Sequence, residues 1–330
     1  MPLPEELFAA IQREVGRADS NALARASQEL TRSYKAGSYS RPPIQSAAHR
    51  AAYLAVRFPA TYAVNLRVLT ELRRLAPRVD ICSLLDLGAG PGTAVFAAAA
   101  IFPELRQATE LESSDPWLKL GKQISAESSL PVLREAEWIR QDLQSKFDAS
   151  PHDLVAISYA LGELPAEAAA ALLDHAWNLA KQFLVVIEPG TPRGFAAIHR
   201  ARAAIISAGA HILAPCPHNH ACPMAGTRDW CHFAQRVERT SQHRKLKGAA
   251  LGYEDEKFSY IIASRNRIPP VAARIVRHPQ KHSGHVGLAL CGPHGLETKT
   301  VARSDKQNYR LARQAQWGEA WDEFSGERCE

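Results

Sequence analysis

Three cysteines lie within one polar loop and are the most chemically distinctive feature of this chain. Five residues separate Cys216 from Cys222, and eight separate Cys222 from Cys231, with prolines and histidines among them. Thiolates bind soft metals because sulfur is polarizable, and prolines keep such a loop out of helix or strand. The spacing is wider than the cysteine pairs of a common structural zinc site. Three clustered thiolates with a distant fourth suit an iron–sulfur cluster, which usually takes four cysteines.

The fourth ligand must come from elsewhere in the chain. Cys291, in an expected strand of the carboxyl-terminal tail, is our candidate, and it would attach that tail to the loop. Cys82 sits in an apolar run and Cys329 at the terminus, so we interpret both as bystanders. Free cysteines in a loop are the simplest alternative. In an alternative zinc site a loop histidine would replace one thiolate, the candidates being His218, His220 and His232.

A turn with three alternating glycines, Gly88, Gly90 and Gly92, follows an apolar run typical of a buried strand. Such a turn lets backbone N–H groups and a helix N-terminus approach a ligand closely. A dinucleotide fingerprint would need Gly or Ala at position 93, which is threonine. Asp86 ends the strand, where its carboxylate would address the ammonium of a methionine moiety, and Glu112 would accept the two ribose hydroxyls. The pattern favours an S-adenosylmethionine (SAM) site over an ordinary glycine turn.

Further polar residues follow later strands of the same predicted sheet. Asp142, after a third strand, would address the adenine amino group, or else is a helix cap or surface acid. The segment 153–165 would end where substrate and methyl donor meet, with Ser158, Tyr159 and Glu163 facing that crevice. Glu188 ends the next strand. We interpret it as part of a structural rim in preference to a substrate contact. No motif that would name the methylated atom is present, and catalysis would depend largely on alignment of the two substrates.

The segments that must position these residues alternate between strand-like and helix-like patterns. Such alternation predicts a parallel sheet covered by helices on both faces. The strand-like runs cover 81–87, 107–111, 153–159 and 182–187, and the helix-like segments cover 91–102, 115–126, 165–180 and 195–209. Segments 210–214 and 258–263 would complete the sheet, with the cysteine loop inserted between them.

The flanking regions read differently. Residues 4–32 and 45–76 have helical patterns with a polar break at 33–43, whereas the tail has three short strand-like segments, at 274–277, 285–291 and 297–303. Ser304 and Gln307 form a capping box that would open a helix with one basic face, made by Lys306, Arg310 and Arg313. We therefore predict a helical N-terminal region (1–76), a SAM-binding domain (77–265) with a cysteine-rich insertion (214–250), and a small basic β/α module (266–330).

Composition limits the class of protein. The chain has 330 residues, of which 46% are hydrophobic and 22% charged, as in an ordinary globular protein. No run of about 18 apolar residues is present, so no membrane span is predicted. The first residues lack a secretory signal and are acidic, unlike a mitochondrial transit peptide, so we expect a cytosolic protein with reduced cysteines. No oligomeric state follows from the sequence.

Positive charge is concentrated in one part of the chain. Between His211 and Arg313 there are 17 Lys and Arg against seven Asp and Glu, although the whole chain has a net charge of only +6. Such a concentration is expected for a protein that binds a polyanion, although a solvated basic surface would have the same composition.

Six segments together resemble a known family. They are Leu-Asp-Leu-Gly-Ala-Gly-Pro-Gly (85–92), Ser-Tyr-Ala-Leu-Gly-Glu-Leu-Pro (158–165), Val-Ile-Glu-Pro-Gly-Thr-Pro (186–192), Ala-Pro-Cys-Pro-His (214–218), Trp-Cys-His-Phe (230–233) and Leu-Gly-Tyr-Glu-Asp-Glu-Lys-Phe-Ser-Tyr (251–260). From about residue 50 onward the chain is similar to the methyltransferase-like proteins of the mitochondrial small ribosomal subunit and their bacterial homologues.

The resemblance implies a class I methyltransferase fold, a four-iron–four-sulfur ([4Fe–4S]) cluster on four cysteines, and action on or beside small-subunit ribosomal RNA. By motif match the cluster ligands would be Cys216, Cys222, Cys231 and Cys291. Our leading hypothesis is a SAM-dependent methyltransferase of ribosomal RNA whose basic insertion and tail hold RNA phosphates. The rival is a non-catalytic assembly factor that keeps the fold, and a more distant alternative is a small-molecule methyltransferase with a zinc-stabilised lid.

Overall fold

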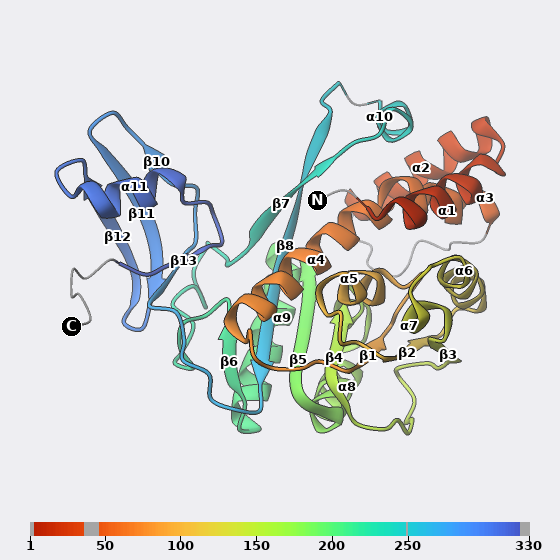
Figure 1. Cartoon of the computed structure of the whole chain (residues 1–330), viewed down its shortest axis with the longest axis horizontal. Helices are drawn as coiled ribbons and strands as arrows, with labels where there is room; N and C mark the ends of the chain where they lie inside the picture. Colours follow the sequence, from red (N-terminus) through yellow and green to blue (C-terminus); the bar gives the residue numbers. More distant parts are fainter. Residues whose placement is uncertain (1–2, 36–45, 249, 324–330) are drawn as a thin grey trace.

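The computed structural model of the chain describes residues 3–35, 46–248 and 250–323 (Figure 1). At its centre is an eight-stranded sheet with the strand order β3-β2-β1-β4-β5-β8-β6, and β7 pairs with β8 off this path. Its strands are β1 (Ser83–Leu87), β2 (Gln107–Glu112), β3 (Glu137–Arg140), β4 (His152–Ser158), β5 (Ala180–Pro189), β6 (His211–Ala214), β7 (Phe233–Glu238) and β8 (Tyr253–Ser264). The predicted α/β class, a class I methyltransferase sheet, is confirmed. The apolar runs in the sequence define no range for β3 and do not predict β7.

The first five strands are parallel, whereas β8 lies antiparallel between β5 and β6. Both faces of the sheet are buried, because alternate residues of each strand point to opposite sides. Leu84 belongs to the core beneath α4–α7, and Leu85 belongs to the core beneath α8 and α9. Strands covered in this way read as continuous apolar runs, which is why the sequence predicts most of them.

Helices flank the sheet and form the N-terminal region. Each predicted N-terminal helical segment is split in two, around Arg17–Asp19 in the first and at Arg57 in the second. The polar break predicted at 33–43 falls largely outside the described residues. The helices up to β6 are α1 (Glu5–Gly16), α2 (Ser20–Lys35), α3 (Ala47–Val56), α4 (Phe58–Leu75), α5 (Thr93–Ile101), α6 (Asp115–Ala126), α7 (Pro131–Arg134), the 3₁₀ helix η1 (Leu161–Glu163), α8 (Ala166–Leu179) and α9 (Pro192–Ser207).

The segment between β6 and β8 contains the cysteine loop and a projecting hairpin. We call residues 233–258 the insertion arm; it consists of β7, α10 (Ser241–Lys247) and the first half of β8. Strand β8 begins at Tyr253, five residues before the expected start at 258. Because Phe258 pairs with Pro189 at the end of β5, residues 253–257 extend beyond the carboxyl edge of the parallel strands. Figure 1 shows the arm reaching towards the N-terminal helices, and α10 packs against α2 and α3.

The carboxyl-terminal unit is a separate five-stranded antiparallel sheet with one helix. It has its own small core, which includes Leu288, Leu290 and Trp321. Its elements are β9 (Ala273–Ile275), β10 (Gln280–Lys281), β11 (His285–Gly292), β12 (Gly295–Ala302), α11 (Lys306–Gln314) and β13 (Ala320–Trp321). The predicted capping box is wrong, because Asp305 is the cap and accepts from the Asn308 N–H at 3.2 Å. The three domain boundaries stay predictions.

No helix in the described ranges has both the length and the apolar character needed to cross a membrane.

Candidate functional site

The glycine turn links β1 to α5 and lies over the carboxyl ends of β1 and β4. All three glycines have positive φ, +83° at Gly88, +57° at Gly90 and +89° at Gly92, which side-chain-bearing residues rarely adopt. A Cβ on Gly88 would lie 2.6 Å from the Cβ of Ala160, whereas one on Gly90 would meet nothing within 4 Å. The turn is therefore closely packed at Gly88 and open at Gly90.

A cavity of about 330 Å³ lies beside this turn. Gly88 and Gly90 line it, and so do Ser158, Tyr159 and Glu163 at the end of β4. The sheet order reverses between β1 and β4, and ligands of open α/β sheets bind at such a switch point. The fold therefore brings the predicted donor loop and the predicted acceptor residues to one cavity.

The predicted donor carboxylates lie behind the turn. Asp86 and Glu112 are buried and do not line the cavity; Glu112 accepts the N–H groups of Gly90 at 2.9 Å and of Ser114 at 2.7 Å. Asp142 is exposed and accepts the N–H of Gln144 at 3.0 Å, as a surface turn residue would. Gly92 also lies outside the cavity lining, against Trp138. The roles proposed for these four residues in binding the donor stay predictions.

Asp86 has a buried partner that sequence analysis did not identify. Glu110 lies directly opposite it on β2. Burial raises the pKa of Asp86 to about 7, and burial together with the Asp86 charge raises the pKa of Glu110 well above its ordinary value. The pKa of Glu110 is thus shifted in favour of its protonated form, and Glu110 lies opposite Asp86 across the β1–β2 pair. The signal was present in the sequence as an acidic residue inside an apolar strand.

Tyr159 is the most strained residue of the cavity wall. It has φ of +58°, and its buried hydroxyl has no hydrogen-bond partner among the residues described. Burial raises its pKa well above the ordinary value, so the hydroxyl stays protonated. Beside it, Ser158 Oγ accepts a hydrogen bond from buried Asn65 at 2.9 Å. The wall thus contains one buried O–H group without a partner among the described residues and one hydroxyl held by α4.

Glu188 ends β5 in the same wall. It is 2% exposed and accepts the N–H of Gly162 at 3.0 Å. Burial raises its pKa to about 7. Glu188 also borders a second cavity of about 420 Å³ between the beginnings of α8 and α9. The residue interpreted as a rim is therefore a titratable group at the cavity.

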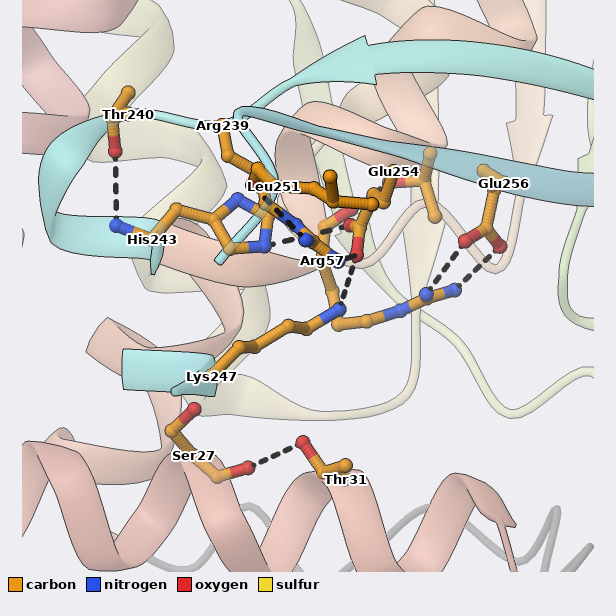
Figure 2. Close-up of polar contacts among 11 residues, drawn as sticks. Ser27, Thr31, Arg57, Arg239, Thr240, His243, Lys247, Leu251, Glu254 and Glu256 are labelled. Atoms are coloured by element: carbon orange, nitrogen blue, oxygen red, sulfur yellow. Dashed lines mark hydrogen bonds and ion pairs between the residues drawn. The ribbon is translucent and has the colours of Figure 1, made fainter. Parts of the chain in front are cut away.

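The roof of the cavity was not foreseen. It is built from Tyr53 on α3, Arg57 between α3 and α4, and Glu256 on the insertion arm. Arg57 donates two hydrogen bonds to the Glu256 carboxylate, at 2.9 and 3.0 Å, and both side chains are mostly buried (Figure 2). These residues are 199 positions apart, so only the unusual Tyr-Glu-Asp-Glu-Lys segment signalled that the arm has a role.

A second set of charges lies at the far end of the arm, beside α10. Glu254 accepts hydrogen bonds from Arg239 at 2.9 Å and from Lys247 at 2.7 Å (Figure 2). His243, on α10, is 1% exposed with its ring 3.5 Å from the same carboxylate. Burial lowers the pKa of His243 to about 4 despite that neighbour, so it is neutral at pH 7.

The four candidate metal ligands surround a third, mainly apolar cavity, here called the cysteine cavity. Cys216, Cys222 and Cys231 approach it from the loop and Cys291 from β11. None of them forms a disulfide, and none of the three loop histidines lines the cavity. Burial raises the pKa of the Cys291 thiol to about 12 and that of Cys231 well above its ordinary value. Within the described ranges, no three His, Cys, Asp or Glu side chains are arranged to hold a metal ion.

Of the other two cysteines, Cys82 does not line this cavity. Cys82 precedes β1 and donates its backbone N–H to Asp153 at 3.0 Å. Cys329 lies outside the described residues.

Basic side chains are exposed on the arm and on the carboxyl-terminal unit. On the arm they are Arg236 of β7, Arg244 and Lys245 of α10, and Lys257 of β8. On the carboxyl-terminal unit they include Lys281, Arg303, Lys306, Arg310 and Arg313, and the last three lie on α11 as predicted.

Comparisons with known proteins agree with the resemblance. A family model described as mitochondrial small ribosomal subunit Rsm22 matches residues 47–322. The ribosome assembly protein METTL17, mitochondrial, of Homo sapiens is 28% identical over 81% of this chain, and the match covers 61% of that protein. Rsm22-cox11 tandem protein 2, mitochondrial, of Schizosaccharomyces pombe is 28% identical over 81% of this chain, and the match covers 42% of that protein. The chain thus spans less than two thirds of these relatives' lengths.

Among solved structures, a magnesium protoporphyrin IX methyltransferase from Synechocystis PCC 6803 with bound SAH is similar with a TM-score of 0.41 and 14% sequence identity. That likeness covers 63% of this chain and 84% of the other.

Proposed function

This chain belongs to the Rsm22 family of the mitochondrial small ribosomal subunit, and from that premise we propose that it is a SAM-dependent methyltransferase of small-subunit ribosomal RNA. The observation that carries the proposal is the cavity at the switch point of the sheet, where the glycine turn meets Ser158 and Tyr159. A donor bound at the turn and an acceptor at the end of β4 would share one cavity.

The chain's own residues supply binding and alignment. SAM, when bound, supplies a methyl group on a sulfonium that is already a good leaving group. The open position at Gly90 lets a ligand approach the turn without meeting a side chain. The Tyr159 hydroxyl donates to the acceptor group, and Asn65 orients the Ser158 hydroxyl beside it. Glu188, with a pKa of about 7, accepts the proton that a nucleophile loses at neutral pH.

RNA would reach this cavity along the exposed basic side chains of the insertion arm and the carboxyl-terminal unit. Each neutralised phosphate releases counterions, so affinity should fall steeply with salt. Binding of small-subunit ribosomal RNA that is unchanged between low and high salt would contradict this part of the proposal.

A non-catalytic assembly factor is the second candidate, favoured by the name of the human relative. The deciding experiment replaces the gene with Tyr159→Phe and maps modified nucleotides in ribosomal RNA beside a deletion strain. For a methyltransferase, one modification disappears in both strains, while subunits still assemble in the Tyr159→Phe strain. If the modifications are identical in wild type and deletion while assembly stalls, the enzyme proposal is wrong and the assembly role stands.

We also propose that Cys216, Cys222, Cys231 and Cys291 hold a [4Fe–4S] cluster. The donor set fits, because four thiols converge on one cavity and soft thiolates select iron–sulfur clusters or zinc. Zinc on the same four thiols is the alternative.

The metal centre is tested by iron and sulfide analysis of anaerobically purified protein. We expect brown protein that loses its colour in Cys231→Ser and keeps it in Cys82→Ser, which removes a cysteine outside the cavity. Zinc without iron or sulfide would support the small-molecule methyltransferase with a zinc-stabilised lid. A folded, metal-free wild type would reject both centres.

The cytosol is our proposed location because thiols stay reduced there, and the mitochondrial relatives make the mitochondrial matrix the alternative.

A further inference from the structure

Two buried arginines border the cysteine cavity from different parts of the fold. Arg202 lies on α9 and is 5% exposed, and Arg274 lies on β9 of the carboxyl-terminal unit and is 1% exposed. Both line the cavity together with the four cysteines. Because burial of a guanidinium is costly without hydrogen bonds and counter-charge, each needs a physical reason to be there.

Backbone oxygens satisfy part of each guanidinium. Arg202 Nη2 donates to the carbonyls of His218 at 2.7 Å and His220 at 2.8 Å. These carbonyls belong to the loop between Cys216 and Cys222. Arg274 donates from Nε to the carbonyl of Pro215 at 2.9 Å. The two arginines therefore hold the segment that carries the first loop cysteines.

Carboxylates neutralise the two guanidinium charges only in part, although backbone carbonyls accept several of their hydrogen bonds. Arg274 Nη1 contacts Glu71 at 2.6 Å, but Glu71 is also paired with Arg74. Arg202 has no carboxylate partner among the described residues. Each guanidinium keeps one buried nitrogen without a partner in this part of the chain, Nε in Arg202 and Nη2 in Arg274.

We infer that Arg202 and Arg274 are the counter-charges of an anionic metal centre held by the four cysteines, an inference that rests on the proposed cluster. Four thiolates carry four negative charges, and a cluster core of charge +2 leaves a centre of charge −2. Two guanidiniums balance that charge inside the cavity. Their free N–H groups would donate to the cysteine sulfurs, which are the acceptors that line the site.

The position of Arg274 gives the balance a structural consequence. Its Nη1 bridges Glu71 on α4 and the carbonyl of Gly318 in the carboxyl-terminal unit, the latter at 3.0 Å. One side chain thus borders the cysteine cavity and contacts both α4 and the basic carboxyl-terminal unit. Arg202 and Arg274 act as positioning residues, since neither would ligate the metal.

The test compares Arg202→Gln, which removes the charge, with Arg202→Lys, which keeps it. Arg200→Gln is the matched control, because Arg200 is exposed on the same helix. Iron content and the midpoint reduction potential are measured on full-length, anaerobically purified protein. Loss of a nearby positive charge disfavours the reduced, more negative cluster.

We expect Arg202→Gln to lower the ratio of reduced to oxidised cluster at a fixed potential roughly tenfold, which is 59 mV for a one-electron couple. Arg202→Lys and Arg200→Gln should stay close to wild type. If Arg202→Gln loses its iron while Arg202→Lys keeps it, the charge role is also supported.

Two results overturn the inference without touching the proposed cluster. One is an iron-replete Arg202→Gln with the wild-type potential. The other is equal loss of iron in Arg202→Gln and Arg202→Lys, which would assign Arg202 to loop geometry alone. An iron-free wild type is a different failure, because it removes the proposed cluster itself.

Discussion

The open position at Gly90 allows ligand binding to be separated from folding. Gly90→Ala places a methyl group where no protein atom lies within 4 Å, at a residue that lines the donor cavity. The substitution forces alanine into the left-handed region at φ of +57°, which costs about 1 to 2 kcal/mol. The added carbon would meet any ligand that approaches the turn. We expect SAM affinity to fall at least about tenfold, or about 1.4 kcal/mol.

Gly248 supplies the matched control for this experiment. It caps α10 with φ of +58°, and a Cβ there also meets nothing within 4 Å. Gly248→Ala should therefore lose the same stability as Gly90→Ala and bind SAM like wild type. Gly88→Ala should be less stable than either, because its Cβ would lie 2.6 Å from Ala160 and such overpacking adds about 1 to 3 kcal/mol.

The assay pairs urea denaturation with isothermal calorimetry of SAM binding for wild type and the three variants. If Gly90→Ala binds SAM as tightly as wild type while losing the expected stability, the turn does not cradle the donor. If wild type itself gives no heat, the methyltransferase proposal fails.

Three further outcomes follow from the cavity and the insertion arm. A double-mutant cycle of Arg57→Met and Glu256→Gln in urea denaturation should give a coupling energy of about 1 kcal/mol; additivity would show that their paired hydrogen bonds do not hold the arm. Burial depresses the folded pKa of His243 to about 4, so its contribution is complete above pH 6.5 and is lost as pH falls towards 4, by at most about 1.4 kcal/mol per unit. His243→Gln should flatten this part of the stability profile, and an unchanged slope between pH 6.5 and 4 would assign it to other groups. Tyr159→Phe removes a buried hydroxyl without a partner among the described residues, so thermal unfolding should show equal or higher stability, whereas a loss above about 1 kcal/mol would reveal a missing hydrogen bond.

The sheet, the cavity beside the glycine turn and the cysteine cavity differ in how much of each could be predicted from the sequence. The parallel strands were readable because both of their faces are buried. The sequence alone grouped Cys291 with the loop cysteines, and the fold does bring it to their cavity. In both cases local composition carries the signal.

The insertion arm was missed because its strand has no buried face. Residues 253–257 of β8 read Tyr-Glu-Asp-Glu-Lys, and each is exposed or only half-buried. Pairing with β7 and contacts with the N-terminal helices specify this strand, and neither leaves an alternating apolar pattern in the sequence. The Arg57–Glu256 contact was out of reach for the same reason, since long-range pairing fixes it.

Strand β8 connects the cysteine cavity with the donor cavity, which is the cavity beside the glycine turn. Tyr260 and Ile261 line the cysteine cavity, and Asp255, Glu256 and Lys257 line the donor cavity. At about 3.4 Å per residue, Glu256 and Tyr260 are only about 14 Å apart along a strand that pairs with β7 up to Phe258 and with β5 from Phe258 onward. Ser259 also donates to the carbonyl of Cys231 at 2.8 Å. A catalytic enzyme and a pure assembly factor would both need this strand in place, so an intact fold cannot distinguish them. The Tyr159 hydroxyl can distinguish them. It has no hydrogen-bond partner among the described residues, whereas a bound acceptor would use it as a hydrogen-bond donor.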